Sequence, residues 1–286
     1  MNIGLLGLDT SHSPAFTRIL QEQFPEHPVI GAWPGGSDAI PASRDRVAGF
    51  TRDIESLGVP IFGSPSEVAR HADALLILSL DGASHLPLYR EVVRRGLPVF
   101  IDKPVAGSPD EAEQIFSLAE EHAAPLFSAS SLRFLPEFAA AIQAVPREEL
   151  RHFDLTGPLN RIEGVPLYHF YAVHSVELLV AALGPDWAEC HPDPDEPERF
   201  LFRWRNGATA SLRLSVPAAD AGFNGALHRS VRAVPFALEA PLYIPFVGKL
   251  IEFFLAGLSP VVKEETLAII GILEAMGTRI RGFRRR

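Results

Sequence analysis

Residues 2–14 read Asn-Ile-Gly-Leu-Leu-Gly-Leu-Asp-Thr-Ser-His-Ser-Pro, an apolar run that ends in a glycine and a cluster of turn-forming residues. The run predicts a buried strand over residues 3–8, and the amphipathic residues 15–24 predict a helix. We expect further short strands at 29–33, 74–80, 98–101 and 125–128, and helices at 44–57, 67–71, 86–95 and 110–122. This alternation indicates an α/β fold with a Rossmann-type, doubly wound parallel sheet.

Two of the expected helices begin with the pattern Ser-Pro-x-Glu, at residues 64–67 and 108–111. A serine at this place caps the first turn with its hydroxyl, proline fits the first helical position, and the acid favours the positive end of the helix dipole. The pattern therefore predicts where these helices start.

The pattern changes after about residue 130. Two β-rich runs, 199–205 and 208–216, are joined by Asn206-Gly207, which is a strong hairpin signal. We also expect strands at 150–156 and 228–237, helices at 172–183, 243–256 and 264–281, and a surface loop at 191–198. The sequence thus predicts a doubly wound α/β domain over residues 1–128. An α+β domain with a mostly antiparallel sheet would follow over 129–286.

Composition excludes several classes of protein. The 286 residues are 47% apolar and carry a net charge of −9, which excludes a disordered chain and argues against a nucleic-acid-binding face. The lone Cys190 excludes an internal disulfide framework and a cysteine-based zinc site. The longest apolar stretch, 246–258, is interrupted by Lys249 and Glu252 and is too short to span a bilayer. With no cationic leader at the N-terminus, we expect a cytoplasmic protein without a membrane partner.

The first strand–helix turn is where a parallel sheet of this kind takes a pyrophosphate. The dinucleotide fingerprint has glycines at the positions of Gly7, Asp9 and His12, and only the first is glycine here. Thr10, Ser11 and His12 can instead donate hydrogen bonds from their side chains. We take Gly7, Asp9, Thr10, Ser11 and His12 as candidate cofactor contacts.

The second strand ends without the Asp or Glu that usually binds the ribose of NAD. Ser37 and Arg44 follow in a loop, and Arg44 is a candidate for a 2′-phosphate, although a plain turn with a solvated arginine explains it equally well. Ser79 and Leu80, at the end of the third expected strand, and Lys103, after the fourth, complete the candidate cofactor contacts. The cofactor is therefore predicted to be NAD or NADP.

Lysine is scarce: only Lys103, Lys249 and Lys263 occur among 26 basic residues. The segment Asp102-Lys103-Pro104, after the strand at 98–101, resembles the Glu-Lys-Pro motif of the glucose–fructose oxidoreductase / inositol dehydrogenase (Gfo/Idh/MocA) family. His85, the segment Ser-Leu-Arg-Phe-Leu-Pro at 131–136 and the segment His-Ser-Val-Glu-Leu-Leu at 174–179 are similar to further family motifs in the same order. The sequence looks like a divergent branch of that family.

This resemblance implies an NAD(P)-dependent oxidoreductase that acts on a sugar, polyol or related hydroxy or keto compound. Lys103 and His174 would be the catalytic pair, with the ammonium on the substrate oxygen and the imidazole moving the hydroxyl proton. The residues implied to hold substrate are Arg133, Tyr168, His169 and Glu177. The resemblance further implies that residues 1–128 bind the dinucleotide and that residues 129–286 bind substrate. It also implies a homodimer or homotetramer formed through the C-terminal sheet.

The chain departs from the family at Phe170, where relatives commonly carry an Asp four residues before the histidine. Two alternatives therefore stay open: a cofactor-free binding or regulatory protein, and a non-redox lyase or epimerase on the same scaffold. His169, His174 and Glu177 do not complete a metal shell, so no metal is expected.

Overall fold

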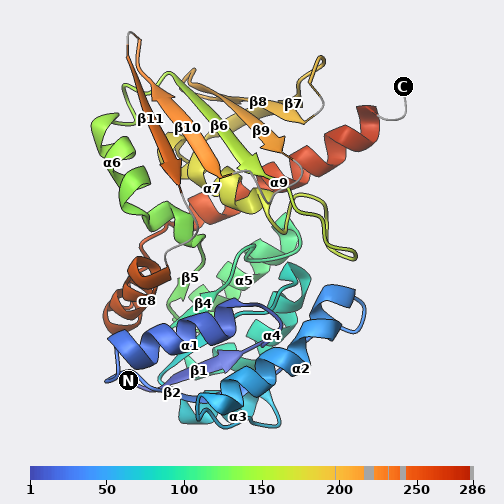
Figure 1. The fold of residues 1–286 in the computed structure, drawn as a ribbon, viewed down its shortest axis with the longest axis vertical. Helices are drawn as coiled ribbons and strands as arrows, with labels where there is room; N and C mark the ends of the chain where they lie inside the picture. The colour runs from blue at the N-terminus through green and yellow to red at the C-terminus, as the bar shows by residue number, and fades with distance from the viewer. Residues whose placement is uncertain (197, 216–221, 231, 239–242, 284–286) are drawn as a thin grey trace. The chain divides into compact units, whose positions relative to one another are not determined.

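The computed structural model describes residues 1–196, 198–215, 222–230, 232–238 and 243–283 (Figure 1). The chain divides into two compact units. The first comprises residues 1–129, 163–165 and 243–262, and the second comprises residues 130–162, 166–242 and 263–286. The roles predicted for residues 1–128 and 129–286 remain predictions.

The first unit is built on a parallel sheet in the order β2-β1-β3-β4-β5. Its strands are β1 (Ile3–Leu6), β2 (Val29–Trp33), β3 (Ala74–Ile77), β4 (Val99–Ile101) and β5 (Leu126–Phe127). An isolated parallel bridge between Ala32 and Ile61 adds a remnant strand outside β2. The chain therefore reverses its direction of strand addition between β1 and β3, which is where open α/β sheets bind ligands.

The helices of this unit alternate with its strands, as expected. They are α1 (His12–Gln23), α2 (Pro41–Ser56), α3 (Pro65–His71), α4 (His85–Val92) and α5 (Pro109–Glu121), with short 3₁₀ turns η1 (Gly82–Ser84) and η2 (Val93–Arg95) at the two ends of α4. The two Ser-Pro-x-Glu signals are confirmed as helix starts. Ser64 Oγ accepts a hydrogen bond from the Glu67 amide at 3.2 Å, and Ser108 Oγ accepts one from the Glu111 amide at 3.3 Å.

Helix α8 (Tyr243–Ala256) belongs to the first unit although it lies late in the sequence. Its apolar stripe is buried: the Phe246 ring lies 5.7 Å from Phe16, 5.4 Å from Phe100 and 6.1 Å from Phe127. These contacts join α8 to α1 and to the strand ends of the parallel sheet. The aromatic cluster thus packs α8, which is distant in sequence, against the first unit's parallel sheet and α1.

The second unit contains a mostly antiparallel sheet in the order β11-β10-β6-β9-β8-β7. Its strands are β6 (His152–Pro158), β7 (Trp187–Pro192), β8 (Arg199–Trp204), β9 (Thr209–Ser215), β10 (Phe223–His228) and β11 (Ala233–Leu238). The hairpin at Asn206-Gly207 is confirmed, because β8 and β9 pair antiparallel around it. Among the described strands of this sheet, only β6 and β9 pair in parallel.

The helices of the second unit are α6 (Pro136–Ala144), α7 (Ala172–Leu183) and α9 (Lys263–Phe283), with a 3₁₀ turn η3 (Ser131–Phe134) before α6. Helix α7 is buried along almost its whole length and contacts β6, β9 and α9. In the part of the chain that the structure describes, no helix combines the length and apolar character needed to cross a bilayer.

Two expectations for this unit are wrong, and one helix was not predicted. Residues 228–237 are not one strand, since β10 ends at His228, Arg229 and Arg232 form a backbone hydrogen bond, and β11 returns antiparallel. The loop expected at 191–198 starts later, because β7 extends to Pro192. Helix α6 was not expected, since its alanine-rich sequence has a weak apolar pattern and lacks a side-chain cap.

Candidate functional site

The β1–α1 turn shows why one fingerprint glycine is needed. Gly7 has φ of 91°, and a Cβ on it would lie 2.6 Å from the amide nitrogen of Ser79 at the end of β3. A side chain here would both strain the backbone and push β1 away from β3. Gly7 therefore keeps the turn tight against its neighbouring strand.

Asp9 takes the position of the second fingerprint glycine and is almost completely buried. Its carboxylate accepts hydrogen bonds from the Leu80 amide at 2.9 Å and from the Ser43 hydroxyl at 2.6 Å. Ser43 Oγ in turn accepts from the Ser37 amide at 2.7 Å. Burial raises the pKa of Asp9, although these hydrogen bonds oppose the shift. The side chain thus joins the ends of β1 and β3 to the loop after β2.

His12 takes the position of the third glycine and pairs with Asp102 at the end of β4. The distance from Nδ1 to the carboxylate oxygen is 2.5 Å, and the other oxygen of Asp102 accepts the Lys103 amide at 2.8 Å. The His12 ring stacks on Phe16 at 5.0 Å and meets the edge of Tyr243 at 5.2 Å. The pair therefore fixes the backbone beside Lys103, whose bond to Pro104 is cis.

The N-terminus of α1 suits an anion. Ser11 makes no side-chain capping hydrogen bond there, and the first turn of α1 has no acidic residue. Thr10 turns its hydroxyl to the Leu78 carbonyl at 3.1 Å, so its side chain supports the turn. The first-turn amides and the helix dipole are the groups that bind a pyrophosphate in this fold.

A pocket of about 290 Å³ lies at the carboxyl ends of β1, β2 and β3, beside this turn. Its walls combine apolar surface from Trp33, Pro87 and Leu88 with carboxylates from Asp9, Asp81 and Glu91. Ser37, Ser79 and Ser84 add hydroxyls, and none of the described lining residues is basic. The volume is near the lower end of ligand sites, about 300–1,000 Å³, and suits one nucleoside half of a dinucleotide.

Some of the predicted cofactor contacts line this pocket, and others do not. Asp9, Ser37 and Ser79 line the pocket, and Leu80 contributes its amide to Asp9. Arg44 does not line the pocket; its Nε lies 3.1 Å from the exposed carboxylate of neighbouring Asp45.

In the second unit, His174 lies on the first turn of α7. Its Nδ1 atom is 2.6 Å from the hydroxyl of Ser130, the residue that caps η3. Glu177, one turn further along α7, is buried and accepts the Ser130 amide at 2.7 Å. The His-x-x-Glu spacing therefore directs both side chains onto Ser130.

Arg133, predicted to bind substrate, lies in a buried ion-pair network. Its guanidinium donates to Glu265 of α9, and another of its nitrogens lies 3.9 Å from Glu177. Glu265 also accepts from Arg147 at 3.2 Å. The network holds η3, α7 and α9 together, which gives Arg133 a structural function inside this unit.

Tyr168 and His169, also predicted to hold substrate, are both buried. The Tyr168 ring packs edge-on against Phe200 of β8 at 5.4 Å. Phe170, which replaces the family Asp, lies 5.9 Å from the ring of Tyr171. The carboxylate expected near His174 from the family pattern is thus replaced in sequence by an aromatic side chain.

Sequence reasoning missed several residues that shape these sites. Ser130 precedes a recognised motif but has no signature of its own, and the His12–Asp102 pair joins positions 90 residues apart. His85 was noticed as a family feature; the structure buries it, with Nδ1 3.1 Å from the Pro104 carbonyl and Nε2 3.0 Å from the Ser79 carbonyl. It thereby joins the end of β3 to the segment after Lys103.

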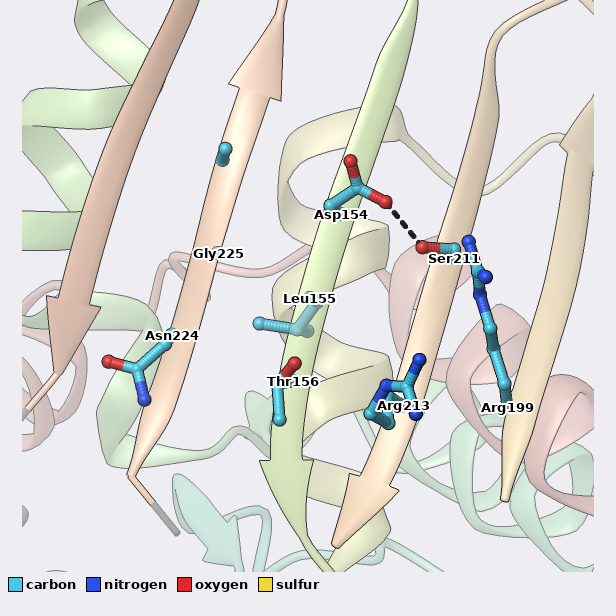
Figure 2. A pocket seen from close by; sticks show the side chains of 9 residues that line it. Asp154, Leu155, Thr156, Arg199, Ser211, Arg213, Asn224 and Gly225 are labelled. Carbon is cyan, nitrogen blue, oxygen red and sulfur yellow. Dashed lines mark hydrogen bonds between the residues drawn. The ribbon is translucent and has the colours of Figure 1, made fainter. Parts of the chain in front are cut away.

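A second pocket, of about 340 Å³, lies on the face of the second sheet opposite α7 (Figure 2). Arg199 and Arg213 are cross-strand neighbours there, and Asp154 accepts the Ser211 hydroxyl at 2.5 Å. His152 and His228 also approach Asp154, at 2.9 and 3.0 Å. This face is polar, and its carboxylate is already engaged by the protein.

Comparison with known proteins gives two kinds of similarity. Residues 1–130 match the family model described as oxidoreductase family, NAD-binding Rossmann fold. Myo-inositol dehydrogenase Hyg17 of Streptomyces leeuwenhoekii is 30% identical over 127 residues, which is 44% of this chain and 34% of that protein. The chain spans 34–40% of the length of the curated relatives that it matches.

Solved structures resemble the whole chain in fold. Myo-inositol 2-dehydrogenase from Lactobacillus plantarum has a TM-score of 0.78 at 13% identity, covering 99% of this chain and 98% of that one. Scyllo-inositol dehydrogenase from Lactobacillus casei, determined with NAD(H) and scyllo-inositol, has a TM-score of 0.77 at 14% identity, covering 99% and 97%. The matched residues 1–130 are thus similar to the GFO_IDH_MocA family of oxidoreductases, whose model describes an NAD-binding Rossmann fold.

Proposed function

We propose that this protein is an NAD-dependent oxidoreductase that transfers hydride between the nicotinamide and a sugar, a polyol or a related hydroxy or keto compound. The observation that carries the proposal is the pocket at the carboxyl ends of β1–β3, within the residues matched by the NAD-binding family model. The start of α1 supports it, because the positive end of the helix dipole favours the pyrophosphate of a dinucleotide and no acidic residue lies in the first turn. The relatives named above act on inositols, which supports the substrate class.

NAD, when bound, supplies the carbon that accepts or donates the hydride. Lys103 would bind the reacting oxygen and stabilise the negative charge that develops on it. His174 would take the hydroxyl proton at Nε2 in oxidation and return it in reduction. These two assignments follow the family motif and are tested by Lys103→Ala and His174→Ala.

The pocket favours NAD over NADP. A 2′-phosphate would bring negative charge toward Asp9, Asp81 and Glu91, and no described lining residue offers a compensating cation. Asp81 lines the pocket, and one of its carboxylate oxygens accepts a hydrogen bond from the Ala83 amide at 3.1 Å. We assign to the other carboxylate oxygen of Asp81 the role of accepting hydrogen bonds from the ribose hydroxyls. It would replace the acid that is missing after β2.

The experiment that tests the proposal blocks this pocket. Ser37→Trp places a bulky ring in it, and Ser56→Trp makes the same change on the exposed last turn of α2. We expect NADH to bind the wild-type protein and Ser56→Trp, detected by enhanced NADH fluorescence, and to fail with Ser37→Trp. Equal binding by both variants would place the dinucleotide elsewhere.

A homo-oligomer formed through the second sheet also remains our proposal. Its support is Leu201 of β8, a large apolar side chain that remains exposed. Leu201→Arg should shift the molar mass measured by light scattering toward that of a monomer, whereas Leu255→Arg on α8 should leave it unchanged. A monomeric wild-type protein would contradict the proposal.

A further inference from the structure

We infer that Ser130 is a positioning residue for His174, and that its hydroxyl holds the ring by Nδ1. The inference rests on the proposed function, in which His174 carries the proton. It concerns contacts inside the second unit only.

Ser130 is placed to act on the imidazole. Only 1% of it is exposed, and its Oγ lies 2.6 Å from Nδ1 of His174. Oγ also accepts the Leu132 amide at 3.3 Å, as the cap of η3. A buried hydroxyl with these neighbours has few other rotamers available, so the position of the ring follows from the position of the serine.

Ser130 is itself held from several directions. Its amide donates to Glu177 at 2.7 Å, and Glu177 lies 3.9 Å from Arg133, which donates to Glu265. Moving Ser130 would break hydrogen bonds to buried carboxylates, which is costly. The network that uses Arg133 therefore supports the backbone from which Ser130 reaches His174.

A hydroxyl suits a histidine that changes protonation state. It accepts from Nδ1–H and donates to an unprotonated Nδ1, whereas an ionised carboxylate can only accept and so favours the charged ring. When Nδ1–H donates its hydrogen bond to Ser130 Oγ, Nε2 is unprotonated and can accept the proton from the substrate oxygen. Nδ1 then keeps its hydrogen bond throughout, and no other proton has to move.

The first test observes the ring without any turnover. Histidine ¹⁵N signals of the full-length protein would be recorded against pH, with His174→Gln identifying the signals of His174. We expect one neutral tautomer to dominate in the wild type, a mixed population typical of a solvated imidazole in Ser130→Ala, and recovery in Ser130→Thr. Ser131→Ala, an adjacent buried serine, should match the wild type. An unchanged tautomer balance in Ser130→Ala would overturn the inference, and thermal unfolding would verify that each variant is folded.

The second test uses the reaction. With any sugar or polyol that the wild type oxidises, Ser130→Ala should lower kcat by about 10- to 100-fold, change the pH profile and leave KM nearly unchanged, because a misplaced base slows proton transfer without removing a binding contact. Ser130→Thr should restore most of the rate. Full turnover by His174→Ala would contradict the proposed function instead, so the two failures are distinct.

Discussion

Each unit of the molecule holds a histidine by its Nδ1 atom, but the two partners differ in charge. His12 lies 2.5 Å from the carboxylate of Asp102, and His174 lies 2.6 Å from the hydroxyl of Ser130. Burial by itself would raise the pKa of Asp102, but the nearby charges of His12 and Lys103 lower it to about 2. Asp102 is thus ionised across the physiological range, whereas the neutral Ser130 hydroxyl can either accept a hydrogen bond from His174 or donate one to it.

The difference separates a structural pair from a chemical one. The His12–Asp102 pair connects the β1–α1 turn to the end of β4 and fixes the backbone beside Lys103. The His174–Ser130 pair ends a network that continues through Glu177 and Arg133 to Glu265. We therefore expect changes at the first pair to appear mainly in stability, and changes at the second mainly in turnover.

The largest effect on stability should come from Asp102→Ala. Removing this buried carboxylate leaves His12 and the Lys103 amide without their partner and should lower the free energy of unfolding by about 3 kcal/mol. Urea denaturation measures it. Asp53→Ala on the exposed surface of α2 is the control, and a loss no larger than the control's would remove the structural role of the pair.

The pH dependence of stability should report the same pair. Because the pKa of Asp102 is about 2 in the folded protein and 3.8 ordinarily, its ionisation stabilises the fold above pH 3.8, and this contribution disappears as the pH falls through about 2. It amounts to about 2 kcal/mol. Urea denaturation at several acidic pH values would give the free energy of unfolding of the wild type and of Asp102→Asn. The difference between the two proteins should isolate the contribution of Asp102. Parallel pH curves for the two proteins would show that Asp102 is not the group responsible.

Ser130→Ala should cost less stability than Asp102→Ala. It removes a hydroxyl that contacts one partly buried ring and one backbone amide, so we expect a loss of about 1 kcal/mol in the free energy of unfolding. The same urea assay measures it. A loss as large as that of Asp102→Ala would mean that the two histidine pairs have the same structural role, and the comparison between them would fail.

The smallest effect should come from Asp9→Asn. Neutralising a carboxylate in the pocket wall should tighten NAD⁺ binding by about threefold, the size expected for removing one repulsive charge near the phosphates. Because burial raises the pKa of Asp9, binding by the wild type should strengthen as the pH falls toward that pKa, while the variant should not follow. Calorimetric titration at several pH values checks this. Weaker binding by the variant would assign Asp9 a positive role in holding the cofactor.

Local patterns in the sequence predicted most of the fold. Helix α7 has the expected bounds, 172–183, because its apolar residues are continuous and a glycine follows it. The hairpin at Asn206-Gly207 is likewise encoded in a few adjacent residues. The pairing of β10 with β6 was not predictable, since register between distant strands is set by the packed sheet rather than by neighbouring residues.

The candidate sites were predictable only in part. The turn at Gly7–His12 was found because its motif is local, but the partners of Asp9 and His12 lie 34 to 90 residues away. Arg133 was predicted from a family motif, and its buried contacts with Glu177 and Glu265 became visible only once η3, α7 and α9 were placed together. Residue identity predicts the chemistry a side chain can do, while its partners decide which part of that chemistry it uses.

The most direct test of the account is a calorimetric titration of the purified wild-type protein with NAD⁺ and, separately, with NADP⁺. The account predicts saturable binding of NAD⁺ with one site per chain, and binding of NADP⁺ that is weaker by at least about tenfold, because the pocket offers carboxylates and no cation to a 2′-phosphate. A folded protein that binds neither dinucleotide, or that prefers NADP⁺, would contradict it.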